Sequence, residues 1–315
     1  MEKISIITSI IPSPLKKILK GGLFVFGLKK NNFKKYGGHP AVTRSLIAGL
    51  EELKINFNYN PQCFSDLGET VVVLSGEKQL LQMIKLKKTG VVKKLIAGPN
   101  ITVLADDYDK ILASPEIDIC ITPSEWVKNI YELDCPELIG RVKSWPAGID
   151  IKYWKPSNNT KNKKNILFYD KRPEKNLTEN CKKYCKERGY NVEVLVYGKY
   201  KIEEYKQALE RNSFLIHFVE QESQGISLAE SWAMNVPTMV WNPGFFRWGS
   251  KNYLCCSAPY LTGQTGTFFR DFEEFKKIEE SGAFNPEKYS AKEWLLQNLT
   301  DEKSAQRLLD IINAA

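Results

Sequence analysis

The stretch from Phe214 to Asn242 reads FLIHFVEQESQGISLAESWAMNVPTMVWN. It opens with an apolar run of strand length, Phe214 to Phe218, and then passes through a polar turn at 220–225. Helical character follows over Ser227 to Met234, and a β-rich run returns after Pro237. The pattern predicts a strand, turn, helix and strand in succession, which is the repeating unit of a parallel α/β sheet.

Two glutamates stand eight residues apart in this unit. Glu222 lies in the turn that follows the strand, and Glu230 lies on the helix. The backbone amides around Gln224 to Ser227, which include those of Gly225 and Ile226, stand at the start of the helix and have no intrahelical acceptors. This turn therefore favours an anion such as phosphate. A plainer interpretation is also open, because Ser227 and Glu230 match a capping box in which the glutamate only satisfies backbone donors.

This pair of glutamates resembles the donor-site signature of the retaining GT-B glycosyltransferases, which use nucleotide-activated sugars. The resemblance implies that Glu230 binds the ribose hydroxyls of the nucleotide and that Glu222 faces the donor sugar. An acidic side chain that accepts hydrogen bonds from ribose hydroxyls is also found in dinucleotide-binding folds.

Other motifs resemble the same family in the same order. Gly37 and Gly38 precede a predicted helix, where the family places a Gly-Gly loop that faces the donor. Lys171, Arg172 and Lys175 follow a predicted strand at Asn165 to Asp170, where the family keeps an Arg and a Lys that hold the diphosphate. The resemblance implies Arg172 and Lys175 for this role, with Lys171 as a substitute for either. The chain departs from the family in two respects. It is short, and Gly98-Pro99-Asn100 stands where many members carry a histidine.

The chain has 315 residues, which suits two domains. Short apolar runs alternate with helical stretches in both halves, as in doubly wound parallel sheets. We therefore expect an α/β protein of the GT-B class, in which two Rossmann-like domains face a cleft. The predicted parts are an acceptor-side domain at 1–154, a nucleotide-sugar-binding domain at 155–290, and closing helices at 291–315 that pack back toward the first domain. The strands expected in the first domain are Lys3 to Ile11, Val71 to Leu74, Lys94 to Ala97, Ile101 to Leu104 and Ile117 to Ile121.

Composition indicates a globular protein, with 43% hydrophobic and 26% charged residues. Seven cysteines without regular pairing favour a reducing compartment, and no run approaches the length of a membrane-spanning helix. We expect a cytoplasmic protein. The segment Leu15 to Lys35 carries seven lysines and no acidic residue around an apolar cluster, so it predicts either peripheral binding to an anionic membrane surface or a solvated lysine-rich loop.

These observations predict a retaining glycosyltransferase of the hexosyltransferase type (EC 2.4), which moves a sugar from a UDP- or GDP-sugar to a glycan, lipid or lipid-linked acceptor. No metal is expected, and Asp107-Tyr-Asp109 is interpreted as a solvated loop. A sugar-nucleotide epimerase of the same fold and a non-catalytic sugar-nucleotide binder remain alternatives. A basic nucleic-acid-binding protein is the third alternative, suggested by the net charge of +8, although aromatic residues are not interleaved with the lysine runs as base stacking requires.

Overall fold

The structure is a computed structural model that describes residues 3–12, 38–157, 161–171 and 174–314. It divides into two compact units, which we call unit 1 and unit 2. Unit 1 comprises Met1–Ala147 with Ser304–Ala315, and unit 2 comprises Gly148–Lys303. Gly37, Arg172 and the segment Leu15 to Lys35 lie outside the described residues.

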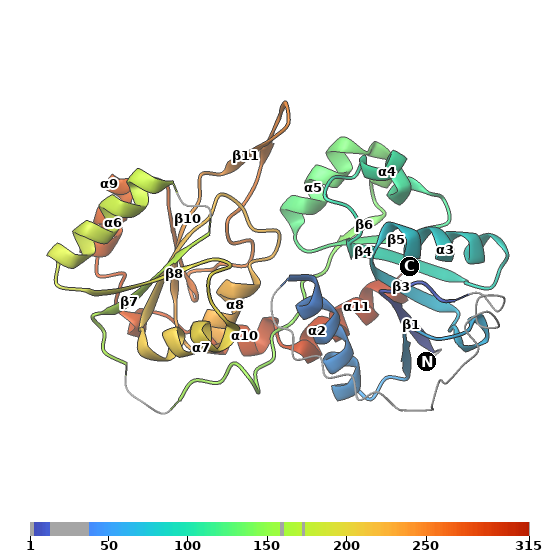
Figure 1. Cartoon of the computed structure of the whole chain (residues 1–315), viewed down its shortest axis with the longest axis horizontal. Coiled ribbons are helices and arrows are strands. Elements are labelled where there is room, and N and C mark those ends of the chain that lie inside the picture. The colour runs from blue at the N-terminus through green and yellow to red at the C-terminus, as the bar shows by residue number, and fades with distance from the viewer. Residues whose placement is uncertain (1–2, 13–37, 158–160, 172–173, 315) are drawn as a thin grey trace. The chain divides into compact units, whose positions relative to one another are not determined.

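Unit 1 contains a six-stranded sheet in which all pairings are parallel (Figure 1). The strand order is β2-β1-β3-β4-β5-β6. The strands are β1 (Ile4–Ile7), β2 (Phe57–Tyr59), β3 (Thr70–Ser75), β4 (Lys94–Asn100), β5 (Ile119–Thr122) and β6 (Val142–Ser144). Helices α2 (Gly38–Glu52), α3 (Glu77–Lys88), α4 (Asp107–Lys110) and α5 (Glu125–Asp134) connect them.

The central strands are buried along almost their whole length, because helices cover them. Five of the six residues of β3 are buried. Residues that alternate along these strands share one core with α3 and α5, and this core includes Val71, Val73, Leu95, Ala97, Leu80, Met83 and Val127. A continuous apolar run therefore formed a strand here, as expected for parallel sheets covered on both faces.

The last helix, α11 (Asp301–Asn313), carries the chain back into unit 1. Trp145 Nε1 donates to the carbonyl oxygen of Ser304 at 2.8 Å, and Ser304 Oγ donates to the carbonyl oxygen of Pro146 at 2.6 Å. Near the other end of the helix, Lys94 Nζ donates to the carbonyl oxygen of Ile312 at 2.8 Å. These bonds fix the returning segment on unit 1.

Unit 2 contains a five-stranded parallel sheet with the order β13-β10-β9-β7-β8. The strands are β7 (Asn165–Asp170), β8 (Asn191–Val196), β9 (Phe214–Phe218), β10 (Thr238–Trp241) and β13 (Gly266–Phe269). A separate two-stranded antiparallel hairpin, β11 (Phe245–Trp248) and β12 (Lys251–Leu254), is inserted after β10.

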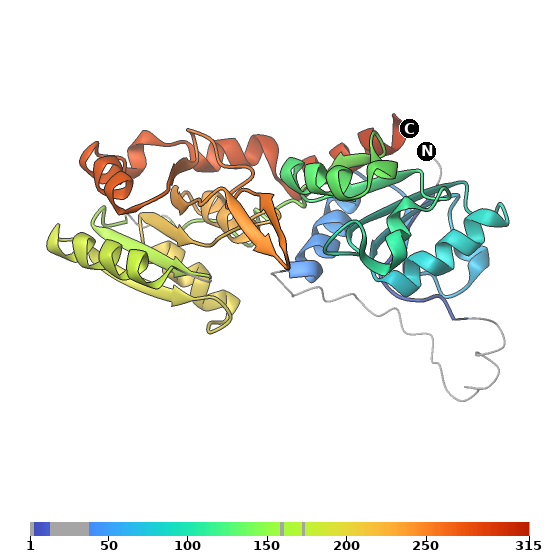
Figure 2. The same cartoon turned by 90° about the horizontal axis from the view of Figure 1, so that it is seen from above.

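Helices cover both faces of this sheet. On one face α6 (Lys175–Glu187) lies beside α9 (Phe272–Glu280), over a core that includes Phe168, Phe218 and Phe275 (Figure 1, Figure 2). On the other face α7 (Ile202–Arg211), α8 (Ile226–Ala233) and α10 (Ala291–Asn298) share a second core. The two faces follow from the side-chain alternation of β7, in which Phe168 and Tyr169 point to opposite sides.

Two strand predictions in unit 1 are wrong. Ile101 to Leu104 is bent and lies outside the sheet, because Asp107 Oδ2 accepts hydrogen bonds from the amides of Val103 and Leu104 at 2.9 Å each. The first strand ends at Ile7 and does not continue to Ile11. There the side-chain oxygen of Asn60 accepts from the amides of Thr8 and Ser9.

Candidate functional site

The strand order of unit 2 locates a candidate site. The chain runs from β7 outward to β8 and then returns to form β9 on the other side of β7, so the direction of winding reverses between β7 and β9. In open α/β sheets, ligands bind at the carboxyl ends of the strands at such a reversal. Lys171 directly follows β7, and the turn from Val219 to Gly225 follows β9.

Lys171 and Glu222 meet at this point. Lys171 Nζ lies 2.7 Å from Glu222 Oε1, and the amide of Lys171 donates to the carbonyl oxygen of Phe218 at 2.9 Å. The side chains are 24% and 10% exposed, and Lys171 Nζ also lies 4.7 Å from the centre of the Tyr197 ring. A cation and a carboxylate, each on a loop that follows a central strand, are therefore one hydrogen bond apart and partly shielded from water.

Glu222 is held from its backbone as well. Its amide donates to the carbonyl oxygen of Cys256 at 3.1 Å. Ser257 Oγ lies 3.0 Å from the carbonyl oxygens of both Val219 and Glu220. The turn that carries Glu222 is thus fastened to the segment that returns from the β11–β12 hairpin.

Helix α8 begins beside this ion pair. Its N-cap is Gly225, with φ +81°, which has no side chain with which to cap the helix. The first intrahelical bond runs from the amide of Ala229 to the carbonyl oxygen of Gly225 at 3.1 Å, so the amides of Ile226, Ser227 and Leu228 precede it. Together with the helix dipole, these amides favour an anion.

The capping-box interpretation of Ser227 and Glu230 is wrong. Ser227 lies inside the helix, one residue after its start at Ile226, and the residue at the N-cap is Gly225. A capping box needs the serine at the N-cap with helical residues after it. The glutamate at position 230 consequently lies a full turn inside α8, where it is only 3% exposed.

A cluster of tyrosines in unit 2 is affected by the negative charge of Glu230. The pKa of Tyr205 is raised by burial and, to a lesser degree, by the negative charge of Glu230. Burial also raises the pKa of Tyr200 to about 12. Tyr205 Oη donates to the carbonyl oxygen of Ser227 at 2.7 Å, and the hydroxyls of Tyr169 and Tyr200 lie 2.6 Å apart. The raised pKa values keep these phenols neutral, so they act as hydrogen-bonding groups and not as charges.

His217 lies on β9, near the carboxyl end of the strand. It is fully buried, and its ring stacks on Tyr169 with a centre-to-centre distance of 4.8 Å. Neither ring nitrogen has a hydrogen-bond partner among the residues that the structure describes. Burial, with a smaller effect from the positive charge of Lys171, lowers the pKa of His217 to about 3. The ring is therefore neutral near pH 7 and cannot carry a positive charge at the site.

The remaining predicted residues are distributed as follows. Lys175 is the first residue of α6 and is exposed, while Gln224 is buried in the turn before α8. Gly38 is the first residue of α2 in unit 1, with φ +59°, and is exposed. Unit 2 thus brings together Lys171, Glu222 and the start of α8.

The tyrosine cluster and the position of His217 were not predicted from the sequence. Tyr197, Tyr200 and Tyr205 follow β8 within nine residues, and this local density of tyrosine was the available signal. A high local density of tyrosine does not by itself predict a functional site, because tyrosines also pack in ordinary cores.

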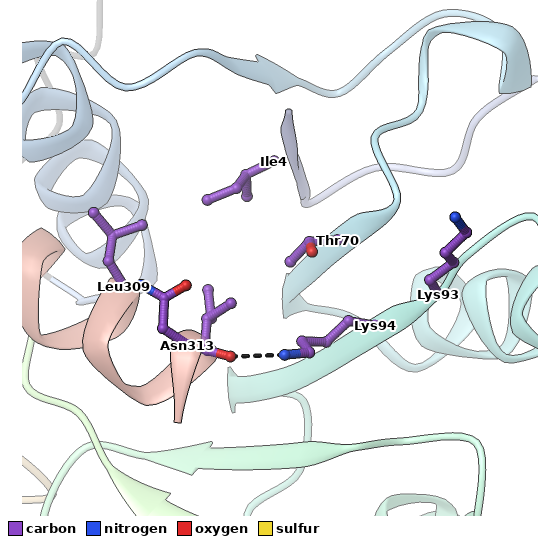
Figure 3. Close-up of a pocket in the computed structure, with 7 residues that line it drawn as sticks. Ile4, Thr70, Lys93, Lys94, Leu309 and Asn313 are labelled. Atoms are coloured by element: carbon purple, nitrogen blue, oxygen red, sulfur yellow. Dashed lines mark hydrogen bonds between the residues drawn. The ribbon is translucent and has the colours of Figure 1, made fainter. Parts of the chain in front are cut away.

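A cavity of about 320 Å³ occurs in unit 1 (Figure 3). Ile4, Thr70 and Lys94 line it from the first residues of β1, β3 and β4, and Leu309, Ile312 and Asn313 line it from α11. It therefore lies at the amino ends of the strands, opposite the edge at which ligands of such sheets bind.

Among the described residues, no cluster of three or more His, Cys, Asp or Glu side chains could hold a metal ion. The carboxylate of Asp107 is occupied by the amides of Val103 and Leu104. Within the same part of the chain, no helix combines the length and the apolarity that crossing a membrane requires.

No protein-family model and no curated protein matches the sequence. The fold, however, is similar to solved structures along the full chain. HepE of Anabaena in complex with UDP has a TM-score of 0.59 and 11% identity, with 100% of both chains covered. The lipopolysaccharide outer core galactosyltransferase WaaB in its apo form has a TM-score of 0.58 and 12% identity, with 99% of both chains covered.

A glycosyltransferase of Rickettsia africae has a TM-score of 0.54 and 11% identity, with 99% of this chain and 97% of that chain covered. The chain has the GT-B fold. The six-stranded sheet of unit 1 and the five-stranded sheet of unit 2 are the two Rossmann-like sheets of this fold. At these identities the likeness establishes the fold, and the activity has to be argued from the residues.

Proposed function

We propose that this protein is a retaining glycosyltransferase that moves a hexose from a UDP- or GDP-sugar to a glycan, lipid or lipid-linked acceptor. The observation that carries the proposal is the Lys171–Glu222 pair at the winding reversal of unit 2, directly beside the start of α8. HepE, which shares the fold, has been solved with UDP and with UDP-glucose, and this supports a nucleotide-sugar donor.

The positive groups of the site suit a diphosphate. Lys171 is held at the edge of the sheet, Lys175 opens α6, and the first amides of α8 point out of that helix. We assign these groups, together with Arg172, to the donor diphosphate. Fixed positive groups stabilise the charge that develops on a leaving diphosphate, and they cost little reorganisation because the fold already holds them.

The two glutamates have separate roles in this proposal. Glu230 binds the ribose hydroxyls, and Glu222 faces the donor sugar. Because Lys171 touches Glu222, the cation assigned to phosphate and the carboxylate assigned to the sugar are already neighbours, as they must be when phosphate and sugar are joined by one bond. Transfer with retention then proceeds without a lasting protein nucleophile, and positioning and charge stabilisation supply the catalysis.

The domain roles and the acceptor are also part of the proposal. Residues 155–290 bind the donor, residues 1–154 handle the acceptor, and 291–315 close back on the first domain. The lysines of Leu15 to Lys35 point to a cytoplasmic protein that binds the membrane peripherally and uses a lipid or lipid-linked acceptor. No metal takes part, because the basic side chains and the helix-start amides supply the positive field.

Glu230→Gln tests the donor assignment, with Glu220→Gln as a matched control. Glu220 is an exposed carboxylate in the turn after β9. Loss of a charge-assisted hydrogen bond costs about 1.5–3 kcal/mol, so UDP binding should weaken roughly 10- to 150-fold in Glu230→Gln. Isothermal titration with UDP, GDP and UDP-glucose measures this.

An unchanged affinity for UDP and GDP in Glu230→Gln would refute the ribose role. A product assay with a hydrolysable donor then identifies the reaction. A transferred or released sugar with retained configuration supports the transferase, whereas an epimerised nucleotide sugar would show that the protein is an epimerase of the same fold.

A further inference from the structure

The β11–β12 hairpin exposes apolar side chains that contribute little to its own packing. Phe245 is 60% exposed, Trp248 is 48% exposed, and Leu254 is 84% exposed. Figure 1 shows β11 extending away from the five-stranded sheet of unit 2. Exposed large apolar residues that cluster on one element mark a contact surface.

The strand register groups these residues. Phe245 pairs with Leu254, and Arg247 pairs with Asn252, so these four side chains share one face of the hairpin. Phe246 and Tyr253 pair on the opposite face, where their rings stack with centres 5.4 Å apart. One face thus presents two neighbouring apolar side chains with a cation beside them.

Charge decides which partner suits this face. The chain carries no Asp or Glu from position 231 to position 270, whereas Arg247 lies on this face and is exposed. Arg247 Nε donates to the carbonyl oxygen of Gly249 at 3.2 Å, which holds the guanidinium close to the hairpin turn. Lys251 is paired in register with Trp248 on the opposite face of the hairpin, together with Phe246 and Tyr253.

We propose that the β11–β12 hairpin binds the surface of an anionic membrane. Arg247 contacts the headgroups, and Phe245 and Leu254, which share its face, enter the boundary with the acyl chains. Apolar insertion adds to electrostatic attraction at this boundary.

Backbone hydrogen bonds connect the base of the hairpin to the turn that carries Glu222. Its two ends are joined by the bond from the amide of Cys255 to the carbonyl oxygen of Gly244, at 3.0 Å. The next residue, Cys256, accepts from the amide of Glu222. If the proposed function holds, a membrane-bound hairpin keeps the Glu222 turn close to the surface from which a lipid-linked acceptor would enter.

Sedimentation of the full-length protein with vesicles tests this, and it requires no donor or acceptor. The vesicles contain phosphatidylcholine with or without phosphatidylglycerol. The wild-type protein should bind only the anionic vesicles at low salt, and the double variant Phe245→Ser/Leu254→Ser should bind about tenfold more weakly. Arg247→Glu should weaken binding at least about fivefold.

Two controls separate the hairpin from other surfaces of the chain. Leu133→Ser/Ile139→Ser changes two side chains of unit 1 that are 72% and 66% exposed, and it should bind vesicles like the wild type. Lys→Glu changes at 29, 30, 34 and 35 test the separate lysine-rich segment. Because the hairpin side chains are exposed, the hairpin variants should keep the wild-type free energy of unfolding in urea, which confirms that they fold.

Three outcomes would overturn the proposal. The wild type could fail to bind anionic vesicles, or the hairpin variants could bind as tightly as the wild type while the Lys→Glu variant loses binding. A third is that hairpin variants keep vesicle binding but bind a soluble glycan more weakly, which would assign the exposed aromatic residues to a sugar. Each outcome leaves the UDP-binding test of the proposed function unaffected.

Discussion

His217 should make the folded protein sensitive to mild acid. Its ring is fully buried, stacks on Tyr169, and has a pKa lowered to about 3 by burial and by Lys171. The unfolded chain has the ordinary pKa of about 6.5. Between these two values the unfolded state binds one more proton than the folded state, so stability is fully present above about pH 6.5 and falls as the pH is lowered toward about 3.

The size of the effect follows from the two pKa values. Each pH unit below the unfolded pKa costs about 1.4 kcal/mol. Between about pH 7.5 and about pH 5 the contribution of His217 should therefore fall by about 2 kcal/mol. A loss of this size is a large fraction of the net stability of a typical domain.

His217→Phe is the informative variant, because it keeps an aromatic ring on Tyr169 and removes both nitrogens. Neither nitrogen has a partner among the described residues, so their removal should cost little at neutral pH. Urea unfolding followed by tryptophan fluorescence gives the stability of each protein at both pH values. His39→Gln, which changes the exposed histidine at the start of α2, is the matched control.

The difference between wild type and variant isolates His217 from the other titrating groups. The wild type should lose about 2 kcal/mol more than His217→Phe on acidification. Equal losses in the two proteins would show that His217 is solvated or hydrogen-bonded in the folded state. The claim that burial and Lys171 lower the pKa of His217 would then be wrong.

Three further predictions concern the site itself. Glu222→Gln should lower turnover more than donor affinity, because its proposed partner is the sugar; steady-state kinetics that leave turnover unchanged would make Glu222 an ordinary loop residue. Activity should persist in EDTA, and loss of activity that manganese restores would contradict metal independence. Gly225→Ala should destabilise the protein by about 1–2 kcal/mol in urea, since φ is +81° and the added Cβ would lie 3.1 Å from Leu228 Cδ1. Gly198→Ala, with φ +79° and no neighbour within 4 Å, isolates the backbone part of that cost.

Much of the fold was predictable because continuous apolar runs formed strands. The predicted limits of β7 and β9 agree with the structure, and β10 follows Pro237 as predicted. The apolar run from Ile101 to Leu104 was also predicted to be a strand, but it formed none. There a carboxylate three residues downstream captured two backbone amides, and such local side-chain bonds compete with pairing into a sheet.

The β11–β12 hairpin could not be predicted from the apolar pattern. Its strands alternate between a stacked face and an exposed face, but apolar residues occupy both, so the alternation of apolar and polar residues is absent. Burial is the physical cause of that alternation in ordinary sheets, and a hairpin that projects from its domain does not obey it.

The candidate site shows a different limit. Glu222 and Glu230 are close in sequence, so the turn and the helix alone fix their relation. Lys171 lies fifty-one residues before Glu222, and the sequence indicated only that each follows a strand. They touch because β8 adds at the edge of the sheet and the chain then crosses back, which places β9 next to β7. Crossover connections between parallel strands are right-handed. Because the chain adds strands in opposite directions before and after β8, helices α6 and α8 lie on opposite faces of the sheet. The contact between Lys171 and Glu222 is therefore a consequence of strand order, which no spacing along the chain encodes.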